Sequence, residues 1–151
     1  MTGLKTNTEY RYRIGYRSPG ETEFLNGPEY FFHTQRVPGT PFVFELQGDS
    51  HPERIPKQND PALCEQTLLG VAKDRPDFFF CIGDDFSVDA LSEVNAKTVE
   101  SSYLKQLPYL GLFAHSTPLF LVNGNHEQSA RCNLDGTADN VAVWAQKNIN
   151  G

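Results

Sequence analysis

The stretch Pro118–Glu127 reads Pro-Leu-Phe-Leu-Val-Asn-Gly-Asn-His-Glu, an apolar run that ends abruptly in permissive and polar residues. Short apolar runs of this kind are typical of strands buried in a parallel sheet with both faces covered. The carboxyl end of such a strand is where α/β sheets usually bind ligands. Gly124, Asn125, His126 and Glu127 therefore mark a candidate site.

The same pattern occurs twice earlier in the chain. The apolar run 42–47 leads into Gly-Asp-Ser-His at 48–51, and the run 78–82 leads into Gly-Asp-Asp at 83–85. The separation of these ends along the chain suits strand–helix–strand units, which need about 30 residues or more. Because parallel strands place their carboxyl ends at one edge of a sheet, we expect the three polar ends to meet there.

These motifs, Gly-Asp-x-His, then Gly-Asp, then Gly-Asn-His-Glu, resemble the N-terminal half of the calcineurin-like metallophosphatase signature. That superfamily includes purple acid phosphatases, PhoD-like phosphatases and many phosphodiesterases. The resemblance covers residues 41–151. It implies an α/β fold, a metallophosphatase-type β-sheet sandwich flanked by helices, of which this chain carries the N-terminal part.

The resemblance also implies a site with two divalent or trivalent metal ions. Asp49, His51 and Asn125 correspond to metal ligands, and Asp84 corresponds to a catalytic carboxylate that bridges both metals. The resemblance leaves the identity of the metals open among Fe, Zn, Mn and Ca. A metal-bound hydroxide would hydrolyse a phosphate ester.

The resemblance also implies roles for two further residues of the third motif. His126 corresponds to a catalytic histidine that hydrogen-bonds phosphate and can protonate the leaving group, and Glu127 to the residue that orients it. The remaining histidines, His33 and His115, belong to no motif and are interpreted as structural or exposed. Asp85 is expected to be solvated.

Two features depart from the family pattern. Purple acid phosphatases carry a tyrosine that binds iron three residues after the bridging aspartate, where this chain has Ser87. The family also completes its site with a later lone histidine and a Gly-His-x-His motif, which the chain to Gly151 does not contain. We therefore expect a plain two-metal phosphatase or phosphodiesterase, truncated at both ends and inactive as this segment alone.

The first 35 residues have a different character. Tyr10, Tyr12 and Ile14 alternate with charged residues and predict a strand, and 30–34 predicts a second. The pair resembles the last two strands of a fibronectin type III sandwich; the alternative is a free-standing hairpin packed on the main domain. The predicted organisation is a β-sandwich remnant, a proline-rich linker and the N-terminal part of a metallophosphatase domain, at residues 1–35, 36–41 and 42–151.

The segments between and after the three apolar runs predict three helices and one loop. Residues 52–59 read as a polar loop, and Asp60-Pro61 reads as a helix cap followed by proline in the first turn. A second helical region at 89–107 should end at Pro108, and a last helix should begin near Asp139.

Composition indicates a globular domain and narrows the possible partners. The 151 residues are 38% hydrophobic and 21% charged, with a net charge of −6 that argues against nucleic acid or a membrane surface as partner. No apolar run approaches the ~18 residues of a membrane span, and no signal peptide opens the chain. Cys64, Cys81 and Cys132 form no disulfide framework, and their redox state stays open.

The sequence thus favours a metallophosphoesterase acting on a phosphate-ester substrate. The sandwich-plus-phosphatase resemblance implies a secreted or periplasmic location. The alternative is a non-catalytic module that binds a partner or polysaccharide and keeps the metal motifs as relics. Metal binding would distinguish the two, whereas the substrate, the preference for mono- or diesters and the oligomeric state do not follow from the sequence.

Overall fold

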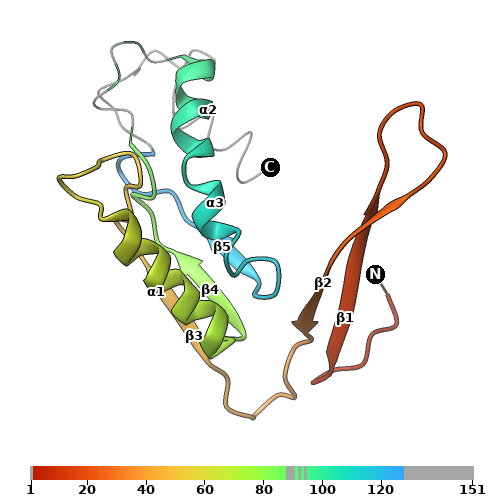
Figure 1. Cartoon of the computed structure of the whole chain (residues 1–151). Helices are drawn as coiled ribbons and strands as arrows, with labels where there is room; N and C mark the ends of the chain where they lie inside the picture. Colours follow the sequence, from red (N-terminus) through yellow and green to blue (C-terminus); the bar gives the residue numbers. More distant parts are fainter. Residues whose placement is uncertain (1, 88–90, 92, 94, 128–151) are drawn as a thin grey trace.

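The computed structural model describes residues 2–87, 91, 93 and 95–127. Within these residues the chain forms an antiparallel hairpin, a parallel three-stranded sheet and three helices (Figure 1). The hairpin pairs β1 (Glu9–Tyr16) with β2 (Leu25–His33). The parallel sheet contains β3 (Phe44–Gln47), β4 (Phe78–Cys81) and β5 (Leu119–Leu121), and the helices are α1 (Pro61–Asp74), α2 (Ala96–Leu104) and α3 (Leu107–Leu110).

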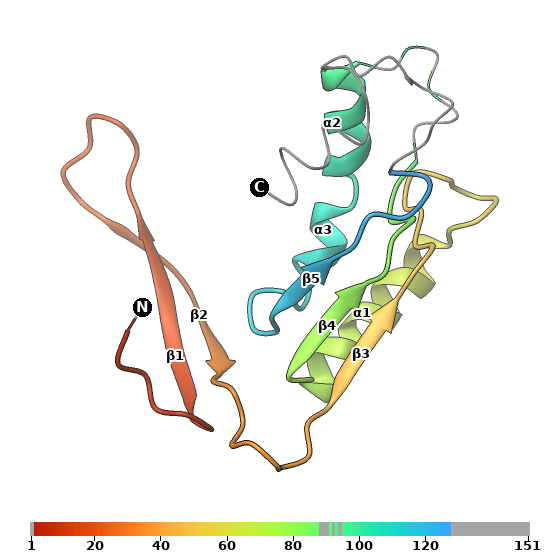
Figure 2. The same cartoon turned by 180° about the vertical axis from the view of Figure 1, so that it is seen from behind.

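The three apolar runs form the parallel sheet that the sequence predicts. β4 lies between the other two strands, with Phe44 opposite Phe78 and Phe79 opposite Leu119. All three strands run in the same direction, so the segments that follow them gather at one edge of the sheet (Figure 2). The predicted meeting of the three polar ends is therefore confirmed.

Local capping explains where the helices begin. The Asp60 side chain accepts hydrogen bonds from the first backbone N–H groups of α1, as the sequence predicts. Asn95 and Thr98 form a capping box at the start of α2. Pro108 lies in the first turn of α3, where its missing N–H costs nothing, so the prediction that it ends a helix is wrong.

Two other expectations concern helices. The helix predicted near Asp139 lies outside the described residues. Among the helices that the structure describes, none combines the length and the apolar character needed to cross a membrane.

The hydrophobic core lies between one face of the parallel sheet and the helices. Phe79 and Cys81 of β4 are buried against Leu68 and Val71 of α1. The Phe113 ring lies 4.6 Å from the Phe79 ring, between centroids. The prediction that Cys81 is a core residue is confirmed, and its burial raises the pKa of the thiol. This packing fixes the sheet and α1 as one unit that carries the loops of the site.

The other face of the parallel sheet is apolar and largely uncovered. The rings of Phe44, Phe78, Phe80 and Phe120 contact one another, with centroid separations between 5.2 and 6.1 Å. Phe120 is nevertheless 50% exposed. An apolar face of this kind is what the second layer of a β-sheet sandwich covers.

The N-terminal hairpin packs on the α/β part. The Tyr12 hydroxyl donates to the backbone carbonyl of His115, and the Tyr30 ring stacks on the His115 ring at 4.4 Å between centroids. The Arg75 guanidinium, just after α1, lies 3.9 Å from the centroid of the Phe31 ring. His115 is therefore structural, as predicted, while the resemblance of the hairpin to fibronectin type III stays a prediction.

Asp77 ties the linker to the sheet. One carboxylate oxygen lies 2.7 Å from Arg36 Nε, and the other accepts from the Val43 N–H at 2.8 Å. Burial alone would raise the pKa of Asp77, but these donors outweigh burial and lower it. Because the pKa is lower in the folded state, the ionised carboxylate stabilises the fold above its ordinary pKa, and the stabilisation disappears as pH falls through the lowered value.

We expect Asp77→Asn to lower the free energy of unfolding by about 1–2 kcal/mol at neutral pH, since charge-assisted hydrogen bonds are lost. Urea denaturation of the intact protein at several pH values measures the effect. The difference from the wild type should shrink in acid, where Asp77 is protonated in both states. The exposed Asp74→Asn is the control. Equal stability of Asp77→Asn and the wild type at neutral pH would contradict the expectation.

Candidate metal centre

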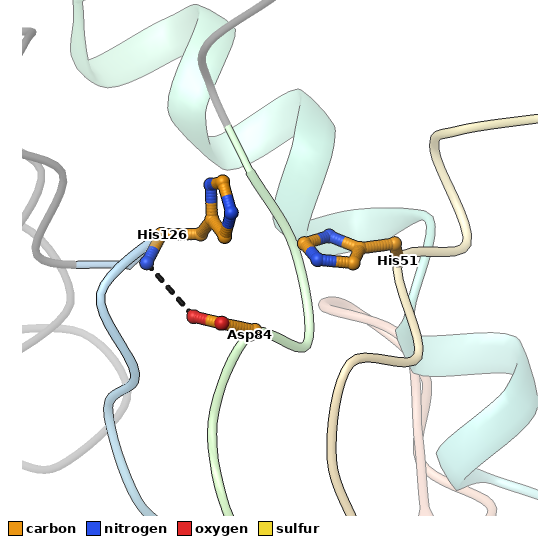
Figure 3. A group of neighbouring side chains, drawn as sticks. All are labelled: His51, Asp84 and His126. Atoms are coloured by element: carbon orange, nitrogen blue, oxygen red, sulfur yellow. Dashed lines mark hydrogen bonds between the residues drawn. The ribbon is translucent and has the colours of Figure 1, made fainter. Parts of the chain in front are cut away.

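Three potential metal ligands meet at the carboxyl edge of the parallel sheet. His51 follows β3, Asp84 follows β4 and His126 follows β5, and one ligand atom of each lies within 4.8 Å of the others (Figure 3). His51 is 3% exposed, and the two imidazole rings meet edge to face with centroids 5.0 Å apart. The structure thus brings together one predicted residue from each motif.

Two glycines allow the loops after β4 and β5 to touch through their backbones. A Cβ atom on Gly83 would lie 2.4 Å from Gly124 N, and Gly83 has a φ of +100°. A Cβ atom on Gly124 would lie 2.3 Å from Asp84 Oδ1. Only glycine fits these positions without displacing a neighbour. The close approach lets the His126 N–H donate to Asp84 Oδ1 at 2.8 Å.

The chain turns sharply after β3 and after β4, and each of these turns contains residues in the left-handed backbone conformation. Asp49 and Asp84 both have φ of 55°, and His51 has φ of 38°. Such conformations are uncommon for residues with a side chain, although Asp and His adopt them more often than most. Residues held in sparsely populated conformations concentrate at functional sites, in keeping with the location of the cluster.

Glu127 holds the β4 and β5 loops together. Its buried carboxylate accepts hydrogen bonds from backbone N–H groups of both loops, at 2.6–3.2 Å, and the donors are Asp84, Asp85, Phe86 and Gly124. These donors offset the cost of burying a carboxylate. The sequence did not indicate this anchoring role, and the orientation of His126 by Glu127 stays a prediction.

Asp85 is buried, so the expectation that it is solvated is wrong. It is 5% exposed, and Ser50 Oγ lies 3.4 Å from its Oδ1. Burial and, to a smaller extent, the negative charge of Glu127 raise the pKa of Asp85 to about 7. Hydrogen bonds from Ser50 and other donors act in the opposite direction and offset part of this rise in pKa. The sequence could not reveal that Asp85 is buried, because its burial depends on the left-handed turn at Asp84.

The other two predicted ligands, Asp49 and Asn125, lie at the same edge but are exposed. The Asp49 backbone N–H donates to the Gly83 carbonyl at 3.1 Å, which joins the β3 and β4 loops. The compact group formed by His51, Asp84 and His126 does not include Asp49. The ligand roles of Asp49 and Asn125 stay predictions.

Two residues that the sequence assigned only to a polar loop contact both histidines. Glu53 Oε1 lies 3.2 Å from His51 Nδ1, and Arg54 Nη2 lies 3.3 Å from His126 Nδ1. The only sequence signal was a charged pair directly downstream of His51. No periodicity marks these residues, because they lie between elements.

The donors of the cluster fit a transition-metal ion. Imidazole nitrogen and carboxylate oxygen are donors that Zn, Fe and Mn accept. In addition, Glu53 Oε2 is buried and has no hydrogen-bond partner among the described residues. An unpaired buried carboxylate oxygen is costly, and a nearby cation would offset that cost.

Comparison with known proteins gives a fold. No protein-family model and no curated protein matches the chain. Among solved structures, the chain is similar to purple acid phosphatase PPD1 isolated from yellow lupin (Lupinus luteus) seeds, with a TM-score of 0.59 and 23% sequence identity. The match covers 95% of this chain and 26% of that one, so the chain spans about a quarter of its length. The described part of the chain therefore has the α/β architecture of a metallophosphatase-type fold.

Proposed function

We propose that the intact protein is a metal-dependent phosphoesterase. The observation that carries the proposal is the grouping of His51, Asp84 and His126 at the carboxyl edge of the sheet, within 4.8 Å of one another. The similarity to a purple acid phosphatase structure supports a phosphate ester as substrate. Because the chain spans 26% of that structure, we propose the activity for the intact protein rather than for this segment alone.

The motif residues would divide the work between metal binding and substrate binding. His51 and Asp84 would hold metal ions together with Asp49 and Asn125, and the two oxygens of Asp84 would allow it to bridge two ions. Bound divalent ions supply Lewis acidity and a water of lowered pKa. His126 would donate a hydrogen bond to a phosphate oxygen and deliver a proton to the leaving group.

The N-terminal segment supports a proposal about domain organisation. We propose that residues 1–35 are the end of a fibronectin type III-like sandwich, joined by the linker 36–41 to a metallophosphatase domain from residue 42. The antiparallel pairing of β1 and β2 is consistent with this proposal. A secreted or periplasmic location would agree with such an arrangement.

Metal-restored hydrolysis tests the proposed activity. The intact protein is stripped of metal with a chelator and assayed with p-nitrophenyl phosphate and bis(p-nitrophenyl) phosphate, with Zn, Mn, Fe or Ca added back separately. We expect turnover to disappear on chelation and to return with at least one metal. Absence of metal binding, or turnover that does not depend on metal, would contradict the proposal and favour a non-catalytic module.

A further inference from the structure

The loop after β3 contacts His51 through a carboxylate. Glu53 Oε1 accepts from the Ser87 N–H at 2.8 Å and from the Ser87 hydroxyl at 2.9 Å. His51 Nδ1 lies 3.2 Å from the same oxygen. Because this oxygen is an acceptor, the His51 nitrogen that faces it must carry the proton. In the neutral ring, His51 Nε2 is then left with a free lone pair.

Arg54, the next residue along the chain, contacts His126 as a hydrogen-bond donor, whereas Glu53 contacts His51 as an acceptor. Arg54 Nη2 lies 3.3 Å from His126 Nδ1. A guanidinium has only donors and does not lose its proton in proteins, so His126 Nδ1 must be the acceptor in this contact. In the neutral ring, the proton of His126 therefore resides on Nε2.

Ser87 and Gln58 hold this pair of charged side chains in place. The Ser87 hydroxyl accepts from Arg54 Nε at 2.8 Å while it donates to Glu53 Oε1. Arg54 Nη1 donates to Gln58 Oε1 at 2.7 Å. With three of its groups engaged, the planar guanidinium has a fixed direction. The Glu53 side chain is 9% exposed, so water does not compete freely for its contacts.

We propose that Glu53 and Arg54 are positioning residues that hold the two histidines in opposite tautomers, His51 with its proton on Nδ1 and His126 with its proton on Nε2. The tautomers follow from the contacts alone. Their functional meaning rests on the proposed phosphoesterase activity.

The two tautomers suit two different tasks. A bare Nε2 on His51 is a metal ligand, and a carboxylate on the other ring nitrogen is the usual partner that orients such a ligand. An N–H at His126 Nε2 is instead a donor toward a phosphate oxygen or a leaving group. The contact with Arg54 thus separates His126 from the ligands, although its atoms lie close enough to bind metal.

Nitrogen NMR of the metal-free intact protein tests the tautomers without any assay of activity. With ¹⁵N-labelled histidine at about pH 8.5, imidazoles are neutral and each N–H nitrogen resonates apart from the bare one. We expect His51 to show N–H at Nδ1 and His126 to show it at Nε2. The same tautomer in both rings would overturn the proposal.

Variants then test which residue sets which tautomer. We expect Glu53→Ala to shift only His51 toward the other tautomer, Glu53→Gln to preserve it through its amide oxygen, and Arg54→Met to shift only His126. Glu29→Ala and Arg13→Met, which disrupt an exposed ion pair on the hairpin, are the controls and should shift neither ring. Tautomers that do not respond to Glu53→Ala and Arg54→Met would overturn the proposal.

Zinc titration separates this proposal from the proposed activity. Glu53→Ala should weaken zinc binding about 10–100-fold, as is usual when the partner of a ligating histidine is lost. Arg54→Met should not weaken it, since His126 is not assigned as a ligand. A protein that shows the stated tautomers but neither binds zinc nor hydrolyses phosphate esters would support the positioning roles and contradict the phosphoesterase.

Discussion

Replacement of Asp84 by asparagine is expected to reduce metal-dependent hydrolysis of phosphate esters by about 10²–10⁴-fold in the intact protein. The substitution keeps an oxygen that can accept from the His126 N–H, so the contact between the β4 and β5 loops survives. It removes the negative charge with which, under the proposed function, Asp84 would help to hold metal ions. Metal ions contribute several kcal/mol of transition-state stabilisation, and each 1.4 kcal/mol is tenfold in rate.

Steady-state kinetics and metal analysis of the same preparations measure this effect. Asp74→Asn, an exposed carboxylate at the end of α1, should retain wild-type turnover and metal content. Urea denaturation should show that Asp84→Asn is folded. Undiminished metal-dependent turnover in folded Asp84→Asn would mean that this carboxylate does not belong to the catalytic site.

Gly124→Ala is expected to lower the free energy of unfolding by about 3 kcal/mol and to abolish metal binding. The new methyl group would lie 2.3 Å from Asp84 Oδ1 and 2.5 Å from Asp84 N, so the two loops must separate. Overpacking usually costs about 1–3 kcal/mol. Separation would also break partly buried hydrogen bonds to Glu127, and leaving a partner unpaired costs about 1–3 kcal/mol when the group is buried.

Gly70→Ala is a matched control that should change the free energy of unfolding in the opposite direction. Gly70 lies within α1, and a Cβ atom there meets no other atom within 4 Å. Alanine in a helix interior is more stable than glycine by about 1 kcal/mol, so this variant should gain stability and keep the site. Urea denaturation and zinc titration of both variants give the comparison. Wild-type stability and zinc affinity in Gly124→Ala would contradict the close approach of the loops.

Local sequence patterns were sufficient to predict the elements that build the sheet. The run of phenylalanines at 78–80 and the apolar run before Asn123 predicted β4 and β5, because burial in a parallel sheet leaves a continuous apolar signal. Asp60-Pro61 predicted the start of α1, since capping is a contact between residues a few positions apart.

Local patterns failed where a contact joins distant segments. Arg54 and His126 are 72 residues apart, and Glu127 and Asp84 are 43 residues apart. Neither separation leaves a periodic signal in the sequence. The same limit explains the wrong expectation for Asp85, whose burial depends on a left-handed turn at Asp84.

The sequence by itself determined that three apolar strands end in polar residues and that these ends lie at one edge of a parallel sheet. This follows from hydrophobic burial and strand direction, which are encoded locally. Only the tertiary structure decided which side chains face one another at that edge. His51, Asp84 and His126 converge because Gly83 and Gly124 let two backbones touch and because Glu127 binds both loops. The contacts between the β4 and β5 loops join residues more than 40 positions apart, so no local pattern records them.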